Sequence, residues 1–218
     1  MMEKVPILYS FRRCPYAIRS RMAIACSGVR MQLREVVLKN KPPELIETSA
    51  KGTVPVVLRE DGRVLEQSLD IVDWVLSVSD PDGWKDYPVE ALAEMANLIE
   101  ENDYSFKANL DRYKYADRYP AEPQEVYRQR CHEYLEKLDR RLDQQACLFS
   151  ERISYADVAI FPFVRQFAKV DEQWFAKAPY PALRDWLERI VTGDLFLSVM
   201  KKYKPWNQGA PSIFFPEN

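Results

Sequence analysis

Hydrophobic and polar residues follow two different periods along the chain. Up to about residue 78, short apolar runs typical of strands alternate with stretches of helical period. In this part we expect strands at 5–10, 33–38, 54–58 and 64–66, and helices at 15–27, 44–48 and from 68 onward. The order β-α-β-α-β-β-α predicts a mixed sheet that is covered by helices.

The rest of the chain carries helical patterns only. Residues 79–88 are rich in turn formers and are the expected linker. The helical stretches that follow are 89–115, 123–147, 155–168, 181–191 and 195–201. Proline and glycine recur in the tail from Pro205, which we expect to be irregular. The predicted fold class is therefore α/β plus all-α: an α/β domain over 1–78, a linker over 79–88, and an all-helical C-terminal domain over 89–218.

Composition and charge exclude several classes of protein. The 218 residues include 31 basic and 33 acidic side chains and are 47% hydrophobic, which is ordinary for a globular protein. A net charge of −2 argues against binding of nucleic acid or an anionic membrane along the whole chain. Residues 1–78 carry 12 basic and 9 acidic side chains, and the remainder carries 19 and 24. The first domain is thus slightly basic, which suits a small anionic ligand.

Histidine and cysteine are scarce, and their spacing limits the possible chemistry. The single histidine, His132, leaves no basis for a histidine-rich metal site, and no metal is expected. The cysteines at 14, 26, 131 and 147 form no C-x-x-C pair, which excludes a zinc ribbon and a dithiol redox motif. No run approaches the roughly 18 apolar residues of a membrane span, and the N-terminus lacks a secretory core. Four dispersed cysteines favour reduced thiols and a cytoplasmic location.

Cys14 is the candidate nucleophile, because it stands between a predicted strand and a predicted helix. Pro15 is favoured in a first helical turn, so Cys14 is expected at the helix N-terminus. Unpaired N–H groups and the helix dipole there stabilise a thiolate, as Arg12 and Arg13 would if they point the same way. Such settings lower the pKa of a cysteine from about 8.5 to roughly 3.5–7.5. The plainer alternative is a buried structural cysteine beside a tight turn.

Ala17 stands where a dithiol enzyme would have its resolving cysteine. Cys26 lies 12 residues further along the same predicted helix, which places it about 18 Å away at ~1.5 Å per residue. A mixed disulfide on Cys14 must therefore be resolved by an external thiol. The sequence indicates a small-thiol cosubstrate.

Four segments together resemble the cytosolic glutathione transferase superfamily, and within it the omega class and its cysteine-type bacterial relatives. They are residues 14–17 (CPYA), 38–42 (LKNKP), 52–56 (GTVPV) and 67–71 (QSLDI). The first 78 residues match nearly throughout, whereas the helical half matches in architecture and in one capping motif. The resemblance implies a thioredoxin-like N-terminal domain, glutathione as cosubstrate, no covalently bound cofactor, and a homodimer.

The resemblance also implies a glutathione site around the catalytic Cys14. A cis Pro55 would turn Val54 so that its N–H and C=O pair with an extended peptide ligand. Ser68, at a helix N-terminus, would bind the γ-glutamyl carboxylate, and Lys41 would bind the glycyl carboxylate. Taken singly, these residues have plainer interpretations: a helix cap, a solvated charge and two ordinary strand residues.

Gln67 departs from the family pattern, which has glutamate there. Its amide oxygen can accept a hydrogen bond from the glutathione amine, but without charge assistance, so weaker glutathione binding is expected. The neighbouring Glu66 is expected to point to the other face, because side chains alternate along a strand.

Other motifs favour structural roles. Ser154 and Asp157 form an S-x-x-D capping box ahead of an apolar run. His132 and Cys131 are neighbours on a helix, so their side chains diverge, and packing or surface roles are favoured for them. Of the aromatic residues, most are expected in the core, and a few would line a second-substrate pocket between the domains. The candidates for that pocket are Tyr16, Tyr104, Phe106 and Tyr113.

The function we expect is glutathione-dependent thiol transfer or reduction, acting on a disulfide, a small oxidant such as dehydroascorbate, or a glutathionylated substrate. One alternative is conjugation of glutathione to an electrophile, for which Tyr9 or Ser10 would stabilise the glutathione thiolate. Another is a non-catalytic interaction protein that reuses the fold. Neither nucleic acid nor a membrane is expected as a partner.

Overall fold

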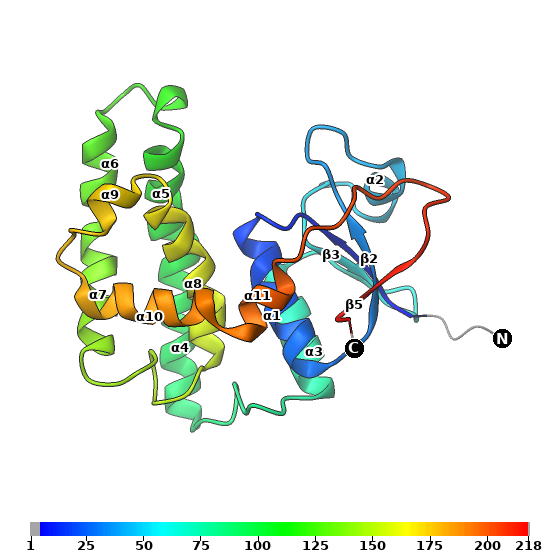
Figure 1. Cartoon of the computed structure of the whole chain (residues 1–218), viewed down its shortest axis with the longest axis horizontal. Coiled ribbons are helices and arrows are strands. Elements are labelled where there is room, and N and C mark those ends of the chain that lie inside the picture. The colour runs from blue at the N-terminus through cyan, green and yellow to red at the C-terminus, as the bar shows by residue number, and fades with distance from the viewer. Residues whose placement is uncertain (1–4, 218) are drawn as a thin grey trace. The chain divides into compact units, whose positions relative to one another are not determined.

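Five strands form one mixed sheet, in the order β4-β3-β1-β2-β5 (Figure 1). The computed structural model describes residues 5–217. The central strand β1 pairs in parallel with β2 and antiparallel with β3, while β4 and β5 pair antiparallel with β3 and β2. The strands are β1 Ile7–Ser10, β2 Met31–Glu35, β3 Val56–Leu58, β4 Val64–Leu65 and β5 Ile213–Phe215. The mixed sheet that the sequence predicted is confirmed.

Three helices cover this sheet, α1 (Pro15–Ser27), α2 (Pro43–Thr48) and α3 (Ser68–Val78). Helix α1 packs against α3 on one side of the sheet, and α2 lies on the other (Figure 1). Helix α1 begins at Pro15 and ends at Gly28, whose φ of 72° is the left-handed value that favours glycine. This helix therefore has the bounds that its proline start and glycine stop predicted.

The C-terminal segment returns to the same sheet. Helix α11 (Asp194–Val199) packs against α1, and β5 extends the sheet beyond β2. The chain accordingly divides into a sheet unit, Met1–Asp82 with Gly193–Asn218, and a helical unit, Gly83–Thr192. This corrects the division that placed 89–218 in one all-helical domain and treated the tail as irregular. The apolar run at 213–215 finds hydrogen-bonding partners on the open edge of β2, which local patterns do not reveal.

The helical unit is built from α-helices with short irregular turns between them (Figure 1). The predicted helix at 89–115 contains a π-helical turn, and the one at 123–147 breaks at Cys131 and ends at Leu142. Its elements are α4 Val89–Glu101, η1 Asn102–Phe106, α5 Lys107–Lys114, η2 Ala116–Arg118, α6 Gln124–Arg130, α7 His132–Leu142, α8 Tyr155–Ala168, α9 Glu172–Phe175 and α10 Pro181–Thr192.

Part of the predicted linker is anchored in the helical unit. Trp84 is 1% exposed, and its carbonyl accepts a hydrogen bond from the Tyr155 N–H at 2.9 Å. Tyr87 shares a hydrogen bond with Ser150 at 2.7 Å. Residues 79–88 are therefore not a free linker, because their second half packs as part of the helical unit. Over the described part of the chain, no helix has the length and apolar character needed to cross a membrane.

Candidate active site

Four segments that carry predicted site residues meet at one edge of the sheet. Because β1 and β2 are parallel, both end at this edge. Strand β3 is antiparallel to β1 and therefore begins there, and β4, antiparallel to β3, ends there. The topology brings together Cys14 after β1, Lys41 after β2, Val54 and Pro55 before β3, and Gln67 and Ser68 after β4.

Cys14 is the N-cap residue of α1, as its position before Pro15 predicted. Its backbone is extended (φ −74°, ψ 125°), its N–H donates to the Phe11 carbonyl at 2.9 Å, and its own carbonyl accepts from the Ile18 N–H at 2.9 Å. No side chain among the described residues caps this helix start. The partly exposed thiol thus sits where first-turn N–H groups and the helix dipole favour a negative charge.

The two arginines before Cys14 are directed to other partners. Arg12 donates from Nη1 to the Met200 carbonyl at 3.2 Å. The Arg13 guanidinium lies over the Phe11 ring, with Cζ 5.3 Å from the ring centroid. These contacts direct Arg12 to the Met200 carbonyl and Arg13 to the Phe11 ring, and neither is a contact with the Cys14 sulfur.

Val54 faces Cys14 across the edge of the sheet. Its carbonyl accepts a hydrogen bond from the Cys14 thiol, with Sγ and O 3.5 Å apart, and the Val54–Pro55 peptide bond is cis, as the resemblance implied. Gly52 precedes this segment with φ of 56°, and a Cβ there would lie 2.6 Å from Ile46 Cδ1. Such a Cβ would also lie 3.6 Å from Lys41 Nζ, so the exposed Lys41 side chain reaches the segment that carries Val54.

Ser68 opens α3, but its hydroxyl already has a partner inside the protein. The fully buried Arg19 donates from Nη1 to Ser68 Oγ at 3.2 Å, and the Ser20 hydroxyl donates to the Ser68 carbonyl at 3.3 Å. Because Arg19 donates to the Ser68 oxygen, the hydroxyl hydrogen of Ser68 is not used in that contact. Arg19 was missed by sequence reasoning, although an arginine among the apolar residues of a predicted helix was a usable signal.

Gln67 is the N-cap residue of α3 and is exposed, which leaves its amide open to a ligand. Glu66, its neighbour, follows the end of β4 at Leu65, so the expected alternation along a strand does not extend to it. Its carboxylate accepts a hydrogen bond from Ser49 and lies 3.6 Å from Lys51 Nζ. The Ser49 hydrogen bond, with help from Lys51, lowers the pKa of Glu66.

The two hydroxyls considered for glutathione conjugation are both buried and engaged. Tyr9 is 1% exposed, and its hydroxyl accepts a hydrogen bond from Arg34 Nη1 at 2.5 Å. Ser10 is 0% exposed, and its hydroxyl accepts from Arg21 Nη1 at 3.4 Å. Neither hydroxyl is presented at the protein surface beside Cys14.

The four aromatic candidates for a second-substrate pocket differ in exposure. Tyr16 is partly exposed on α1, with the Arg19 guanidinium 5.6 Å from its ring centroid. Tyr104 is 73% exposed, whereas Phe106 and Tyr113 are 1% and 2% exposed. The last two pack around Phe167 inside the helical unit, with ring centroids 5.9 and 5.1 Å from it. The role of the four aromatic residues in a second-substrate pocket remains a prediction. Tyr16 and Tyr104 are the two whose rings are accessible.

The remaining predicted motifs have structural surroundings. His132 shares a hydrogen bond with Tyr180, and its Nε2 lies 3.0 Å from Glu136. Burial raises the pKa of the neighbouring Cys131 thiol to about 12. Within residues 5–217, no group of three or more His, Cys, Asp or Glu side chains could hold a metal ion.

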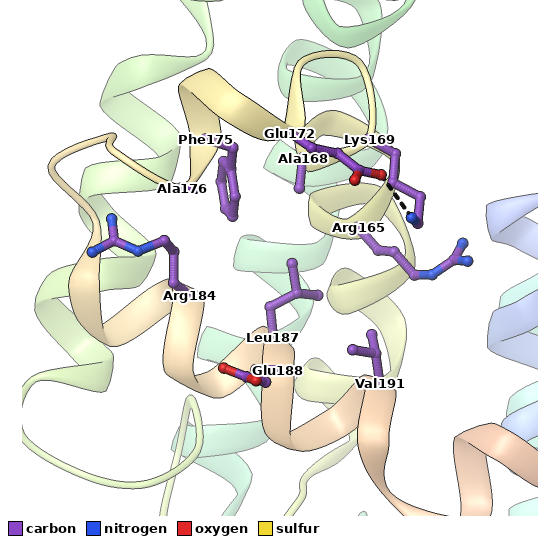
Figure 2. A pocket seen from close by; sticks show the side chains of 10 residues that line it. All are labelled: Arg165, Ala168, Lys169, Glu172, Phe175, Ala176, Arg184, Leu187, Glu188 and Val191. Atoms are coloured by element: carbon purple, nitrogen blue, oxygen red, sulfur yellow. Dashed lines mark hydrogen bonds and ion pairs between the residues drawn. The ribbon is translucent and has the colours of Figure 1, made fainter.

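The helical unit contains a separate pocket of about 290 Å³ between α8, α9 and α10 (Figure 2). Its apolar wall includes Phe175, Leu187 and Val191, and the ion pair of Lys169 with Glu172, at 2.9 Å, lies on its rim. Neither cysteine nor serine lines it. The pocket is therefore distinct from the place where the structure puts Cys14 and Ser68.

Family models match both parts of the chain. A model of the glutathione S-transferase N-terminal domain matches residues 8–81, and one of the C-terminal domain matches 90–189. Glutathione S-transferase omega-1 of Mus musculus is 36% identical over 62 residues, which cover 28% of this chain and 26% of that protein. The matched segment thus spans about a quarter of the omega-1 relative.

Two further relatives match over most of their length. Disulfide-bond oxidoreductase YfcG of Escherichia coli (strain K12) is 28% identical over 179 residues, 77% of each chain. The crystal structure of glutathione transferase Omega 3C from Trametes versicolor superimposes with a TM-score of 0.77 at 17% identity, covering 93% of this chain and 91% of that one. At that identity the likeness shows a common fold.

Proposed function

Because the chain belongs to the glutathione S-transferase family and is similar to its omega class, we propose that it is a glutathione-dependent thiol transferase that works through a mixed disulfide on Cys14. The observation that carries this proposal is the partly exposed Cys14 thiol at the start of α1, beside the Val54 carbonyl. A thiolate at a helix N-terminus is a competent nucleophile toward disulfide sulfur. The likeness to a protein named disulfide-bond oxidoreductase supports the same chemistry.

The proposed reaction has two thiol–disulfide exchanges. In the first, the Cys14 thiolate attacks the glutathione sulfur of a mixed disulfide, R–S–SG. The S–S bond of the substrate breaks as the new disulfide bond forms, and the RS⁻ leaving group takes a proton from solvent to become RSH. In the second, a glutathione thiolate attacks the same sulfur of Cys14–S–SG and releases oxidised glutathione and the Cys14 thiolate. The net reaction converts RSSG and GSH into RSH and GSSG.

An external thiol is needed for the second exchange because this chain offers no internal one near Cys14. Ala17 is fully buried one turn into α1. Cys26 lies at the other end of the same helix, where its Sγ is 3.5 Å from an Asp82 carboxylate oxygen. Burial and Asp82 raise the pKa of Cys26 to about 12, which keeps it a thiol.

We assign the glutathione contacts to the four segments at the edge of the sheet. The Val54 backbone pairs with the cysteinyl residue of glutathione, next to the cis Pro55. The Ser68 hydroxyl and the first N–H groups of α3 bind the γ-glutamyl carboxylate. Gln67 accepts from the glutathione amine, and the Lys41 ammonium binds the glycyl carboxylate. A small oxidant, a disulfide or an electrophile occupies the open side, and the functional unit is a homodimer.

Replacing Cys14 by serine distinguishes thiol transfer from conjugation. Cys14→Ser is expected to abolish reduction of a glutathionylated peptide, because a hydroxyl is not deprotonated at neutral pH, and to spare or raise conjugation of glutathione to an electrophile. Both rates are measured on the full chain, with Cys26→Ser as the control that leaves thiol transfer intact. Retention of peptide reduction in Cys14→Ser would contradict the proposal.

Binding to glutathione separates an enzyme from a non-catalytic protein with the same fold. The wild-type chain is expected to be retained on immobilised glutathione and to be eluted by free glutathione. Failure of retention, together with no peptide reduction, would favour the interaction protein instead.

A further inference from the structure

The turn that carries Cys14 forms a hydrogen bond with the carboxylate of Glu35, a residue outside the turn. Within the turn, the Cys14 N–H donates to the Phe11 carbonyl at 2.9 Å. The Arg12 N–H donates to Glu35 Oε1 at 2.8 Å. Glu35 is the last residue of β2 and pairs with Ser10, the last residue of β1. One oxygen of Glu35 therefore fixes the backbone two residues before Cys14.

The second oxygen of Glu35 binds the helix that begins after Cys14. Glu35 Oε2 lies 3.0 Å from Nη1 of Arg21, which projects from α1 and is fully buried. Burial lowers the pKa of the Arg21 guanidinium, and the Glu35 charge opposes that shift. The same carboxylate thus joins the chain before Cys14 to the helix after it.

A buried ion pair adds little net stability to the contact between a helix and a strand. Desolvation of two charges offsets their attraction, and a well-packed hydrophobic pair of similar volume is often at least as stable. What an apolar residue at position 35 could not supply is an acceptor for the Arg12 N–H. Because an unpaired backbone N–H at a partly buried site is itself unfavourable, the turn depends on Glu35 for its conformation.

The C-terminal segment contacts the same three residues, Arg12, Glu35 and Arg21. The Arg12 guanidinium donates to the Met200 carbonyl, and the Trp206 N–H donates to the Glu35 carbonyl at 2.8 Å. The rings of Tyr203 and Phe215 lie 5.7 and 5.2 Å from the Arg21 guanidinium carbon. Segments distant in sequence therefore hold Glu35 and Arg21 in place.

We propose that Glu35, held by Arg21, is a positioning residue that keeps the Cys14 thiol at the α1 N-terminus. Neither residue touches the reacting sulfur atoms in this account. Both act through the Arg12 N–H and the start of α1. The proposal rests on the assignment of Cys14 as nucleophile and extends it to two residues outside the glutathione contacts.

The test is the rate at which iodoacetamide alkylates Cys14 in the full chain, measured against pH by mass spectrometry of the Cys14 peptide. Glu35→Met, which keeps the side-chain length and leaves the Arg12 N–H without its acceptor, is expected to slow alkylation about tenfold at pH 7 and to move the pH midpoint toward the ordinary thiol value of about 8.5, because the sulfur leaves the helix N-terminus. If Glu35 acted only as a nearby negative charge, its removal would favour the Cys14 thiolate, and alkylation would become faster. A purely structural Glu35 would change the thermal midpoint of unfolding and leave the alkylation profile unmoved.

Asp61→Leu is the matched control. Asp61 also accepts a backbone N–H, that of Arg63 at 3.0 Å, and pairs with Arg59 at 3.3 Å, but in the β3–β4 turn. Its replacement is expected to leave the Cys14 profile unchanged. Should Glu35→Met fail to fold with Arg21 unpaired, the double variant Glu35→Met/Arg21→Met removes both charges and is expected to show the same slow alkylation.

An unchanged or faster Cys14 profile in a folded Glu35 variant would overturn the positioning role. That outcome is distinct from failure of the proposed function, because alkylation requires no glutathione. A wild-type chain that alkylates at Cys14 but never forms a glutathione adduct would overturn the function alone.

Discussion

At the scale of single residues, Cys14 combines backbone hydrogen bonds with apolar packing. Its N–H donates to the Phe11 carbonyl and its thiol to the Val54 carbonyl, and it packs against a buried cluster that includes Tyr9. Arg12 and Arg13 contact the Met200 carbonyl and the Phe11 ring. The position of Cys14 could be predicted because a strand, a cysteine, a proline and a helix are local features of the sequence. The directions of the two arginine side chains depend on Phe11 and on the distant Met200, and could not be predicted.

The buried arginines show the limit of residue-level prediction. Arg19 contacts Ser68, 49 residues away, and Arg21 pairs with Glu35 on another element. From the local sequence, each of these arginines is expected to be exposed on its helix, because arginine is rarely fully buried without a partner. Only the packing of α1 against β2 and α3 supplies those partners.

Gln67 gives a residue-scale prediction about glutathione affinity. Gln67→Glu is expected to lower the Kd for glutathione about fivefold, because a carboxylate forms a charge-assisted hydrogen bond with the ammonium that is about 1 kcal/mol stronger than that of an amide. Isothermal titration calorimetry with glutathione measures the change. Gln67→Met, which keeps the side-chain length and removes the acceptor, is the matched control and should raise the Kd. Equal affinity in all three proteins would show that position 67 does not contact the ligand.

At the scale of elements, those with strong local signals were predicted with their bounds. Helix α1 and helix α8 begin and end at the predicted residues, since a proline and a capping box mark their starts. Strand β2 is displaced from the predicted 33–38 to Met31–Glu35, because its partners are set by β1 and β5. Strand β5 and the four-residue helix α9 were missed. Each is too short for a periodic pattern.

The capping box of α8 gives the element-scale prediction. Ser154 Oγ accepts the Asp157 N–H at 3.4 Å, and the Asp157 carboxylate accepts the Ser154 N–H at 2.8 Å and the Trp186 indole N–H at 2.7 Å. Ser154→Ala is expected to lower the free energy of unfolding by about 1–2 kcal/mol, near the top of the range for a lost N-cap, because Ser154 is fully buried. Urea denaturation followed by circular dichroism measures it.

The exposed cap of α9 is the control for that variant. Asp171 accepts the Trp174 N–H at 2.9 Å, and Asp171→Ala is expected to lower the stability by less, because water can replace its hydrogen bond. The account would be contradicted if Ser154→Ala were no less stable than Asp171→Ala. It would also be contradicted if folded Ser154→Ala lost Cys14 reactivity.

At the scale of the whole molecule, the two-part architecture was predicted and its boundaries were not. Periodicity separated the sheet-forming part from the helical part correctly. It could not show that 193–218 returns to the sheet unit or that Trp84 is anchored in the helical unit, since both depend on contacts between distant segments. The return of the chain matters for the site because Met200 and Trp206 contact the residues that hold the Cys14 turn.

The four cysteines of the chain fall into two chemical groups. Burial raises the pKa of Cys26, Cys131 and Cys147 to about 12 each. At pH 7.5 the thiolate fraction of such a group is on the order of 10⁻⁴ to 10⁻⁵, so these three react slowly with disulfides. Cys14 alone combines partial exposure with a helix N-terminus.

The most direct test of the central claim is the intact mass of the native chain after treatment with oxidised glutathione at pH 7.5, followed by peptide mapping. We predict one glutathione per chain, attached to Cys14 and removed by reduced glutathione. The three remaining cysteines should become modified only after denaturation. A native protein whose Cys14 stays unmodified, or whose adduct maps to another cysteine, would contradict the account.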